Sequence, residues 1–192
     1  MVLMDAYQNR IYAYGKGPSA TEVTAPGVSV TAGNSMVISG KVTDISPGTN
    51  DASLKMRFPN GVPAVSLESQ SAWMLYVYKQ FERPTNATGV EVTLTALDPN
   101  NNYVTLGTTT TDASGTFGFN WVTPNVPGKY TITATFTGSA AYYSSSAQTY
   151  AIIAAPTEPT AEPTQMPATL SETYFLPAIA GLFIVLIVGF VL

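Results

Sequence analysis

The sequence predicts an all-β fold: an antiparallel β-sandwich with one inserted amphipathic helix, followed by a Pro/Thr-rich stalk and a single transmembrane helix. Three observations predict it. Apolar and polar residues alternate with period two between residues 19 and 153, a charge-free apolar run ends the chain, and a Pro/Thr repeat lies between the two. Only 10% of the residues are charged, against roughly 25% in an average soluble domain, which is typical of a β-rich protein with hydroxyl groups on its wet faces.

The composition argues against several classes of function. The net charge is −4 and the eight Lys and Arg residues are scattered, which argues against nucleic acid as a partner. Cysteine and histidine are absent, so there is no disulfide framework, thiolate zinc site or imidazole base. No nucleophile–base pair is visible among the dispersed acids. The sequence therefore predicts a non-enzymatic protein with no catalytic residues and no cofactor.

Residues 1–18 precede the alternating region. They contain a short strand, a polar turn and "RIYAYGKG", and a leading hairpin is the simplest interpretation. The segment also resembles the closing strands of a repeat in PQQ-type β-propellers. That resemblance implies a propeller upstream. No secretory h-region precedes the β domain and no basic residue follows the apolar run, so we expect the chain to be a C-terminal fragment.

Residues 19–153 carry the strand signal. Four runs alternate clearly, with turns such as "DPNNN" and "DASG" between them, namely "MVISGKVT", "VEVTLTAL", "TFGFNWV" and "KYTITATF". Such alternation is typical of strands with one buried and one wet face. With four weaker runs the count is about eight strands, which favours an antiparallel sandwich.

Residues 66–82 interrupt this pattern with helical spacing, inside an insertion at about 45–88. Ser66 is in position to cap the helix, and the expected apolar face consists of Leu67, Met74, Val77, Tyr78 and Phe81. The helix either covers one end of the sandwich or presents a surface to a partner. In the second case Trp73, Tyr76 and Tyr78 are the contact candidates.

The last strands resemble those of bacterial and archaeal cell-surface Ig-like repeat domains. The matching positions follow a Gly-x-Phe, Pro-Gly-x-Tyr and Gly-x-x-x-Tyr-x-x-Ser pattern, at Gly115, Phe117, Pro127, Gly128, Tyr130, Gly138, Tyr142 and Ser145. The resemblance implies an Ig-like sandwich. It implies no activity, because such domains serve as spacers, adhesion modules and enzyme appendages.

Residues 154–173 and 174–192 are predicted to be a stalk and a membrane span. The first segment repeats Pro and Thr without apolar periodicity and favours an extended conformation. The second has no charge and, at 1.5 Å per residue, would span about 28 Å of lipid. Glu158, Glu162 and Glu172 are the only charges between Lys129 and the span. The positive-inside rule therefore favours a single-pass protein of the cell membrane with its β domain outside.

Two further positions have specific chemistry. Asp98, Asn100 and Asn102 have the spacing that opens a calcium loop, but Tyr103 replaces its glycine and Thr109 its twelfth ligand, so a plain hairpin turn is the better interpretation. Asn86 begins the sequon Asn-Ala-Thr in a predicted loop, which makes it a glycosylation candidate.

The leading hypothesis is a membrane-anchored surface protein, whose Ig-like domain serves as a spacer or adhesion module for a larger ectodomain. Its partners would be membrane lipid through residues 174–192 and a protein or glycan at the cell surface. Two alternatives stay open. One is an accessory, carbohydrate-binding module of a surface enzyme whose catalytic part lies upstream. The other is a tail-anchored protein with its β domain in the cytosol.

Overall fold

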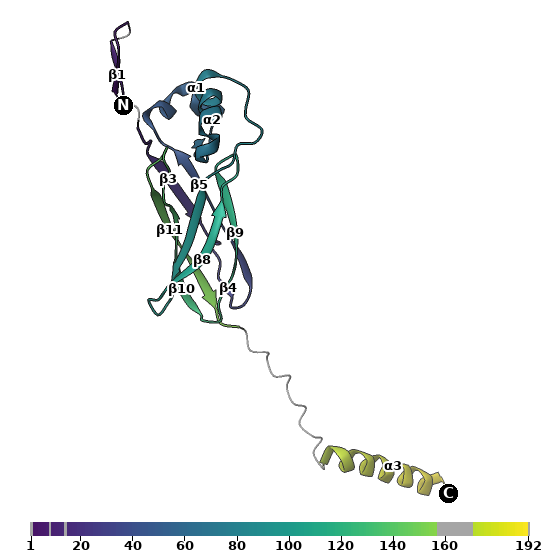
Figure 1. The fold of residues 1–192 in the computed structure, drawn as a ribbon. Helices are drawn as coiled ribbons and strands as arrows, with labels where there is room; N and C mark the ends of the chain where they lie inside the picture. The colour runs from purple at the N-terminus through teal and green to yellow at the C-terminus, as the bar shows by residue number, and fades with distance from the viewer. Residues whose placement is uncertain (1, 8, 14, 157–170, 192) are drawn as a thin grey trace. The chain divides into compact units, whose positions relative to one another are not determined.

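The computed structural model describes residues 2–7, 9–13, 15–156 and 171–191. The chain divides into two compact units, Met1–Pro156 and Thr157–Leu192. The first contains an N-terminal hairpin and the sandwich, and the second contains the apolar helix (Figure 1). Residues 157–170, which include most of the predicted stalk, lie outside the described residues.

Two sheets face each other in the first unit, so the predicted sandwich is confirmed. The larger sheet has five strands in the order β4 (Val30–Thr31), β11 (Ser145–Ala154), β10 (Gly128–Phe136), β7 (Glu91–Leu97) and β8 (Tyr103–Thr110). The other sheet places β3 (Ser19–Thr24) on one side of β5 (Ser35–Asp44), with β9 (Thr116–Val122) and β6 (Val62–Pro63) on the other side. One pair departs from the antiparallel prediction, since β4 runs parallel to β11.

Alternation along the strands decides which side chains fill the space between the sheets. In β10, Tyr130, Ile132, Ala134 and Phe136 are buried, whereas the threonines between them lie on the outer face. The register pairs Thr133 with Thr95 and Thr135 with Thr93 of β7. Aliphatic and aromatic residues of both sheets therefore form one core, and hydroxyl groups cover its outer face.

The insertion between β5 and β7 folds over one end of the sandwich. It contains the 3-10 turn η1 (Pro47–Asn50), α1 (Ala52–Arg57), β6 and α2 (Leu67–Lys79). Residues 45–88 are called the cap below. The predicted helix is present, but it is shorter than 66–82, and α1 and β6 accompany it. The predicted N-cap is also present, since Ser66 accepts a hydrogen bond from the backbone N–H of Ser69.

The buried face of α2 includes the predicted Val77 but otherwise differs from the predicted one. Trp73 and Val77 are buried, whereas Leu67 is 52% exposed and Phe81, beyond the end of the helix, is 61% exposed. The helix ends at Gln80, which has the left-handed conformation with φ of 58°. Because the chain turns there, Phe81 leaves the helical stripe that the sequence pattern assigned to it.

The chain enters and leaves the sandwich at opposite ends. At the end that carries the cap, the N–H of Gly17 donates to Ala141 and the N–H of Tyr143 donates to Gly17. We call this end the cap pole. At the other end β11 pairs with β4, and the N–H of Ala32 donates to the carbonyl of Ala154. We call this the exit pole; Figure 1 shows the chain leaving the sandwich there.

The N-terminal segment forms the predicted hairpin. Strand β1 (Val2–Asp5) pairs with β2 (Arg10–Ala13) in a two-stranded sheet. A propeller blade has four strands, so this pair by itself does not identify one.

The second unit ends in a helix whose described side chains are apolar. A π-helical turn, η2 (Ser171–Phe175), leads into α3 (Leu176–Val191). The stretch Thr173–Phe190 has a mean hydropathy of 2.3, and none of its described side chains is buried. By length and composition this helix is able to cross a membrane.

The packing of β5 against β9 generates a stability prediction. A Cβ added at Gly40 would meet the carbonyl oxygen of Glu22 and the ring of Phe117, whereas one added at Gly118 would meet nothing within 4 Å. Gly40→Ala should therefore lower the free energy of unfolding by about 1–3 kcal/mol, and Gly118→Ala should leave it nearly unchanged. Urea unfolding of both variants checks this, and equal losses would contradict the packing of Phe117 over Gly40.

Candidate functional site

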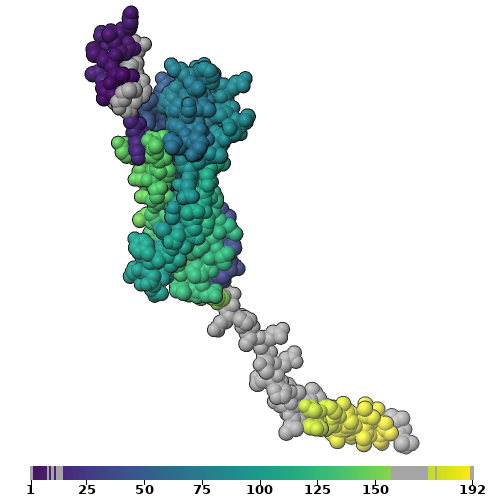
Figure 2. All heavy atoms as spheres, viewed as in Figure 1, coloured from purple at the N-terminus to yellow at the C-terminus, as the bar shows by residue number. Residues whose placement is uncertain are grey.

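The cap is the part of the sandwich unit that most resembles a site, because it adds side chains of a different kind to the sandwich. Figure 2 shows it as a bulge over one end of the strands. Its own small core consists of Leu54, Val62, Val65, Trp73 and Val77. It contains four basic and three acidic residues. Its net charge is thus +1, against −5 for the rest of the chain.

Trp73 does not face solvent, which corrects its assignment as a contact candidate. The side chain is 0% exposed. Its ring centroid lies 5.3 Å from that of Tyr76 and 6.2 Å from that of Phe58. Trp73 therefore packs α2 against α1, and it offers no surface to a partner in this conformation.

Tyr76 and Tyr78 keep accessible surface and remain contact candidates. Tyr76 is half-buried, and the guanidinium of Arg57 lies over its ring with 4.7 Å between Cζ and the ring centroid. Tyr78 is 42% exposed. Burial raises the pKa of the Tyr78 phenol, and the nearby Asp44 carboxylate raises it further. The Tyr78 phenol is therefore neutral at pH 7 and able to donate a hydrogen bond.

A buried polar contact joins the cap to the sandwich. The side-chain amide of Gln70 donates to the hydroxyl of Tyr142 at 3.2 Å, and Tyr142 is only 1% exposed. Burial, followed by the charge of Asp44, raises the pKa of Tyr142. Within the described part of the chain, Oε1 of Gln70 and Nε1 of Trp73 are buried without a hydrogen-bond partner. This junction fixes α2 over the loop between β10 and β11.

Two arginines flank a hollow between the cap and the turn that joins β8 to β9. The hollow has a volume of about 180 Å³ and is lined by Arg57, Phe58, Pro59, Asn60, Gly61, Pro63, Tyr76, Arg83, Ala113 and Ser114. Sequence reasoning missed both arginines because they are 26 positions apart and follow no motif. Half of the basic residues of the chain lie within the insertion, and this concentration is the sequence signal that points to the site.

A second, larger groove lies near the exit pole, where the edges of the two sheets diverge. Its volume is about 490 Å³, and its walls include Val104, Leu106, Phe119, Trp121 and Val122 from β8 and β9. Towards the cap pole, the Thr109 hydroxyl of β8 donates to the carbonyl of Gly118 of β9 at 3.2 Å, and this hydrogen bond connects the two sheet edges. The groove is apolar enough to accept a hydrocarbon group, and no element among the described residues covers it.

The calcium candidates form a turn that uses its own carboxylate. Asp98 Oδ1 accepts hydrogen bonds from the N–H groups of Asn100 and Asn102, and Oδ2 accepts one from the Asn102 side chain. Asn101 has a positive φ of 65°. Among the described residues, no three His, Cys, Asp or Glu side chains are grouped so that they could hold a metal ion. The geometry is that of a hydrogen-bonded hairpin turn, and calcium binding there stays a prediction.

The glycosylation candidate lies where a modification could reach it. Asn86 is exposed, in a turn between α2 and β7. The third residue of the sequon, Thr88, shares a hydrogen bond with the hydroxyl of Ser66 at 2.8 Å. The sequon is thus attached to the N-terminus of α2, and glycosylation of Asn86 stays a prediction.

Truncation of the cap aromatics separates packing from surface roles. Trp73→Ala should lower the free energy of unfolding by about 3–5 kcal/mol, because it empties the centre of the cap core. Tyr78→Ala should lower it by about 1 kcal/mol or less, since much of that side chain is already in water. Thermal unfolding of both variants measures this. Equal stability of Trp73→Ala and wild type would show that the cap core is not packed as described.

The turn at Asp98 should respond to acid and not to calcium. Hydrogen bonds from the side chain and backbone of Asn102 hold the pKa of the Asp98 carboxyl below its usual value. The contribution of the Asp98 carboxylate to the free energy of unfolding is therefore complete at a pH above about 3.9, the pKa of Asp in the unfolded chain. It is lost as the pH falls towards the lower pKa of Asp98 in the folded protein. Asp98→Asn should lose this part of the acid dependence of the urea midpoint. A midpoint that rises with millimolar calcium in wild type, but not in this variant, would show that the turn binds metal.

The comparisons with known proteins identify no family. No family model matches the chain, and no curated protein matches it. One similar solved structure is a tetra-tandem repeat in the extending region of a large adhesion protein, with 18% identity and a TM-score of 0.40 over 76% of this chain and 26% of that one. Another is Spo0M, a sporulation control protein from Bacillus subtilis, with 9% identity and a TM-score of 0.36 over 73% of this chain and 51% of that one. The chain thus spans about a quarter and about half of their lengths.

Proposed function

We propose that the protein is a non-enzymatic, membrane-anchored module of the cell surface. In this proposal the sandwich acts as a spacer, the C-terminal helix anchors it in the membrane, and the cap is the surface that meets a partner. A larger ectodomain ahead of residue 1, such as the β-propeller that residues 1–18 resemble, belongs to the same proposal.

The observation that carries the proposal is the position of the two chain ends of the sandwich. Gly17 is hydrogen-bonded at the cap pole and Ala154 at the exit pole. The ten residues of β11 connect these poles, and at about 3.3 Å per residue they cover about 33 Å. A domain that the chain crosses from end to end lengthens the reach of whatever it connects, whereas one with both ends at the same pole does not.

The second unit supports the anchor. The backbone of α3 satisfies its own hydrogen bonds, as a lipid environment requires. Its described side chains are apolar and unburied, including Leu182, Ile184 and Ile187 at 62–63% exposure. Every charged residue between Lys129 and this helix is acidic. Under the positive-inside rule this supports an extracellular location for the sandwich.

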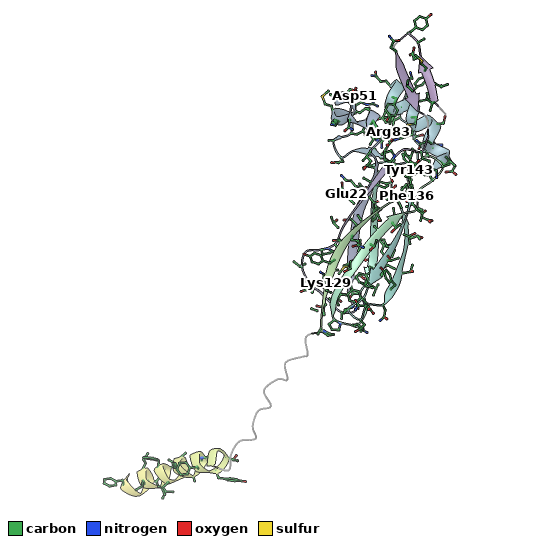
Figure 3. The ribbon with its side chains drawn as sticks, turned by 90° about the vertical axis from the view of Figure 1, so that its left-hand side faces the viewer. Glu22, Asp51, Arg83, Lys129, Phe136 and Tyr143 are labelled. Carbon is green, nitrogen blue, oxygen red and sulfur yellow. The ribbon has the colours of Figure 1, made fainter. Side chains whose placement is uncertain are left out.

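The cap has the right position for a contact surface. The chain that continues towards α3 leaves the sandwich at the exit pole. The cap lies at the opposite pole of the sandwich, away from this exit. Figure 3 shows this separation within the sandwich unit, with Arg83 at the cap and Lys129 near the exit pole. A spacer presents its far end to partners, and here that end carries the two arginines and Tyr76.

Cysteine labelling tests the location, because the chain has no native cysteine. We expect a Thr137→Cys variant, altered in an exposed loop, to react with a membrane-impermeant maleimide on intact cells and to stay in the membrane after alkaline carbonate extraction. Labelling only after permeabilisation would support the tail-anchored cytosolic protein instead. Release by carbonate would contradict the anchor.

A further inference from the structure

We propose that the hollow between the cap and the β8–β9 turn binds the carboxylate of an acidic sugar. This site goes beyond the proposed function and does not depend on the anchor. The argument rests on the two arginines that flank the hollow, on the bonding capacity left on each, and on the chemistry of the walls.

Arg57 is oriented by two hydrogen bonds that leave part of its guanidinium unused. One amino group donates to the carbonyl of Val77 at 3.0 Å and the other to the carbonyl of Tyr76 at 3.1 Å. The plane also lies over the rings of Tyr76 and Phe58, at 4.7 and 5.4 Å from their centroids. A guanidinium has five N–H donors. These contacts use two of them, so a preorganised cation keeps donors for a ligand.

Arg83 approaches the same hollow from the segment after α2. One amino group donates to the carbonyl of Ala113 at 3.2 Å, and the guanidinium lies 5.8 Å from the ring centroid of Trp73. In the described part of the chain neither arginine forms an ion pair with a carboxylate, in contrast to Lys41 and Glu22. Asp112 is near enough to Arg83 to interact with its charge, and its two oxygens accept three hydrogen bonds from Ser114 and Thr116.

The lining of the hollow narrows the chemistry of the ligand. Among the described residues no acidic side chain lines it, and Asn60 and Ser114 add polar groups. Guanidinium groups match the planar, two-oxygen geometry of a carboxylate. Phe58, Pro59, Pro63 and Tyr76 supply apolar walls, which suit the C–H face of a sugar ring that carries this carboxylate.

The volume sets the size of the bound group. At about 180 Å³ the hollow is smaller than the roughly 300–1,000 Å³ of pockets that enclose drug-sized ligands. It therefore takes one group of a larger molecule, and the rest of that molecule stays in solvent. A single uronic acid residue of an acidic polysaccharide fits these constraints.

Binding of trigalacturonate to the full chain in detergent micelles tests the proposal by isothermal titration calorimetry. The methyl ester of the same trisaccharide is the matched ligand control, since it keeps the rings and removes the charge. We expect trigalacturonate to bind, the ester to bind at least about tenfold more weakly, and added salt to weaken the charged ligand. Equal binding of the two, or no binding of either, would overturn the proposal.

Variants locate the site. Arg83→Gln should weaken trigalacturonate binding at least about tenfold, because it removes one cation. It also breaks the bond to Ala113 and the contact with the Trp73 ring, so its unfolding temperature is measured as well. Lys129→Gln removes the same charge near the exit pole and should leave binding unchanged. Arg57→Gln should also weaken binding, and its unfolding temperature is measured because Arg57 also holds the end of α2.

Unchanged binding in Arg83→Gln would overturn the assignment. Tighter binding of the tripeptide acetyl-Ala-Ala-Ala, through its terminal carboxylate, would overturn the sugar as the source of the carboxylate.

Discussion

The antiparallel pair of β10 and β11 is the interaction on which the rest of the structure depends. Nine residue pairs, from Gly128 with Ile153 to Phe136 with Ser145, fix the register of the two strands. A slip of one residue would send the threonines of β10 into the core and its apolar residues to the surface. The second strand of this pair, β11, carries the chain from the cap pole to the exit pole. The pair therefore sets both the identity of the core and the separation of the two chain ends.

The cap depends on this pair through the loop that joins its strands. Tyr142 in that loop packs against Phe136, with 6.5 Å between ring centroids, and its hydroxyl accepts the hydrogen bond from Gln70 on α2. The cap is thus attached to the sandwich through a buried polar contact as well as through apolar packing. Because an unsatisfied buried group is costly, this contact favours one orientation of α2. That orientation places Tyr76 and the end of α2 beside Arg57, where the hollow forms.

Local patterns predicted the parts of the fold that local physics determines. Period-two alternation revealed the strands, and Ser66 revealed the start of α2. The predicted apolar stripe of α2 includes the buried Val77 but leaves out Trp73, which lies on the same face at a spacing of four. Helix α1 has six residues, too few to show a helical period. The site itself could not be predicted, since Arg57, Arg83 and Ser114 are distant in sequence and meet only through the insertion and the β8–β9 turn.

The distance between the two ends of the sandwich is the most direct test of the spacer account. Without native cysteines, spin labels at Lys16→Cys and Ala155→Cys in the full chain report this distance by pulsed electron resonance, with Lys16→Cys and Tyr143→Cys as a pair that shares the cap pole. The account predicts a separation of about 30 Å or more for the first pair, from the rise along β11, and a much shorter distance for the second. Equally short distances for both pairs would show that the chain enters and leaves at the same pole, and would contradict the spacer.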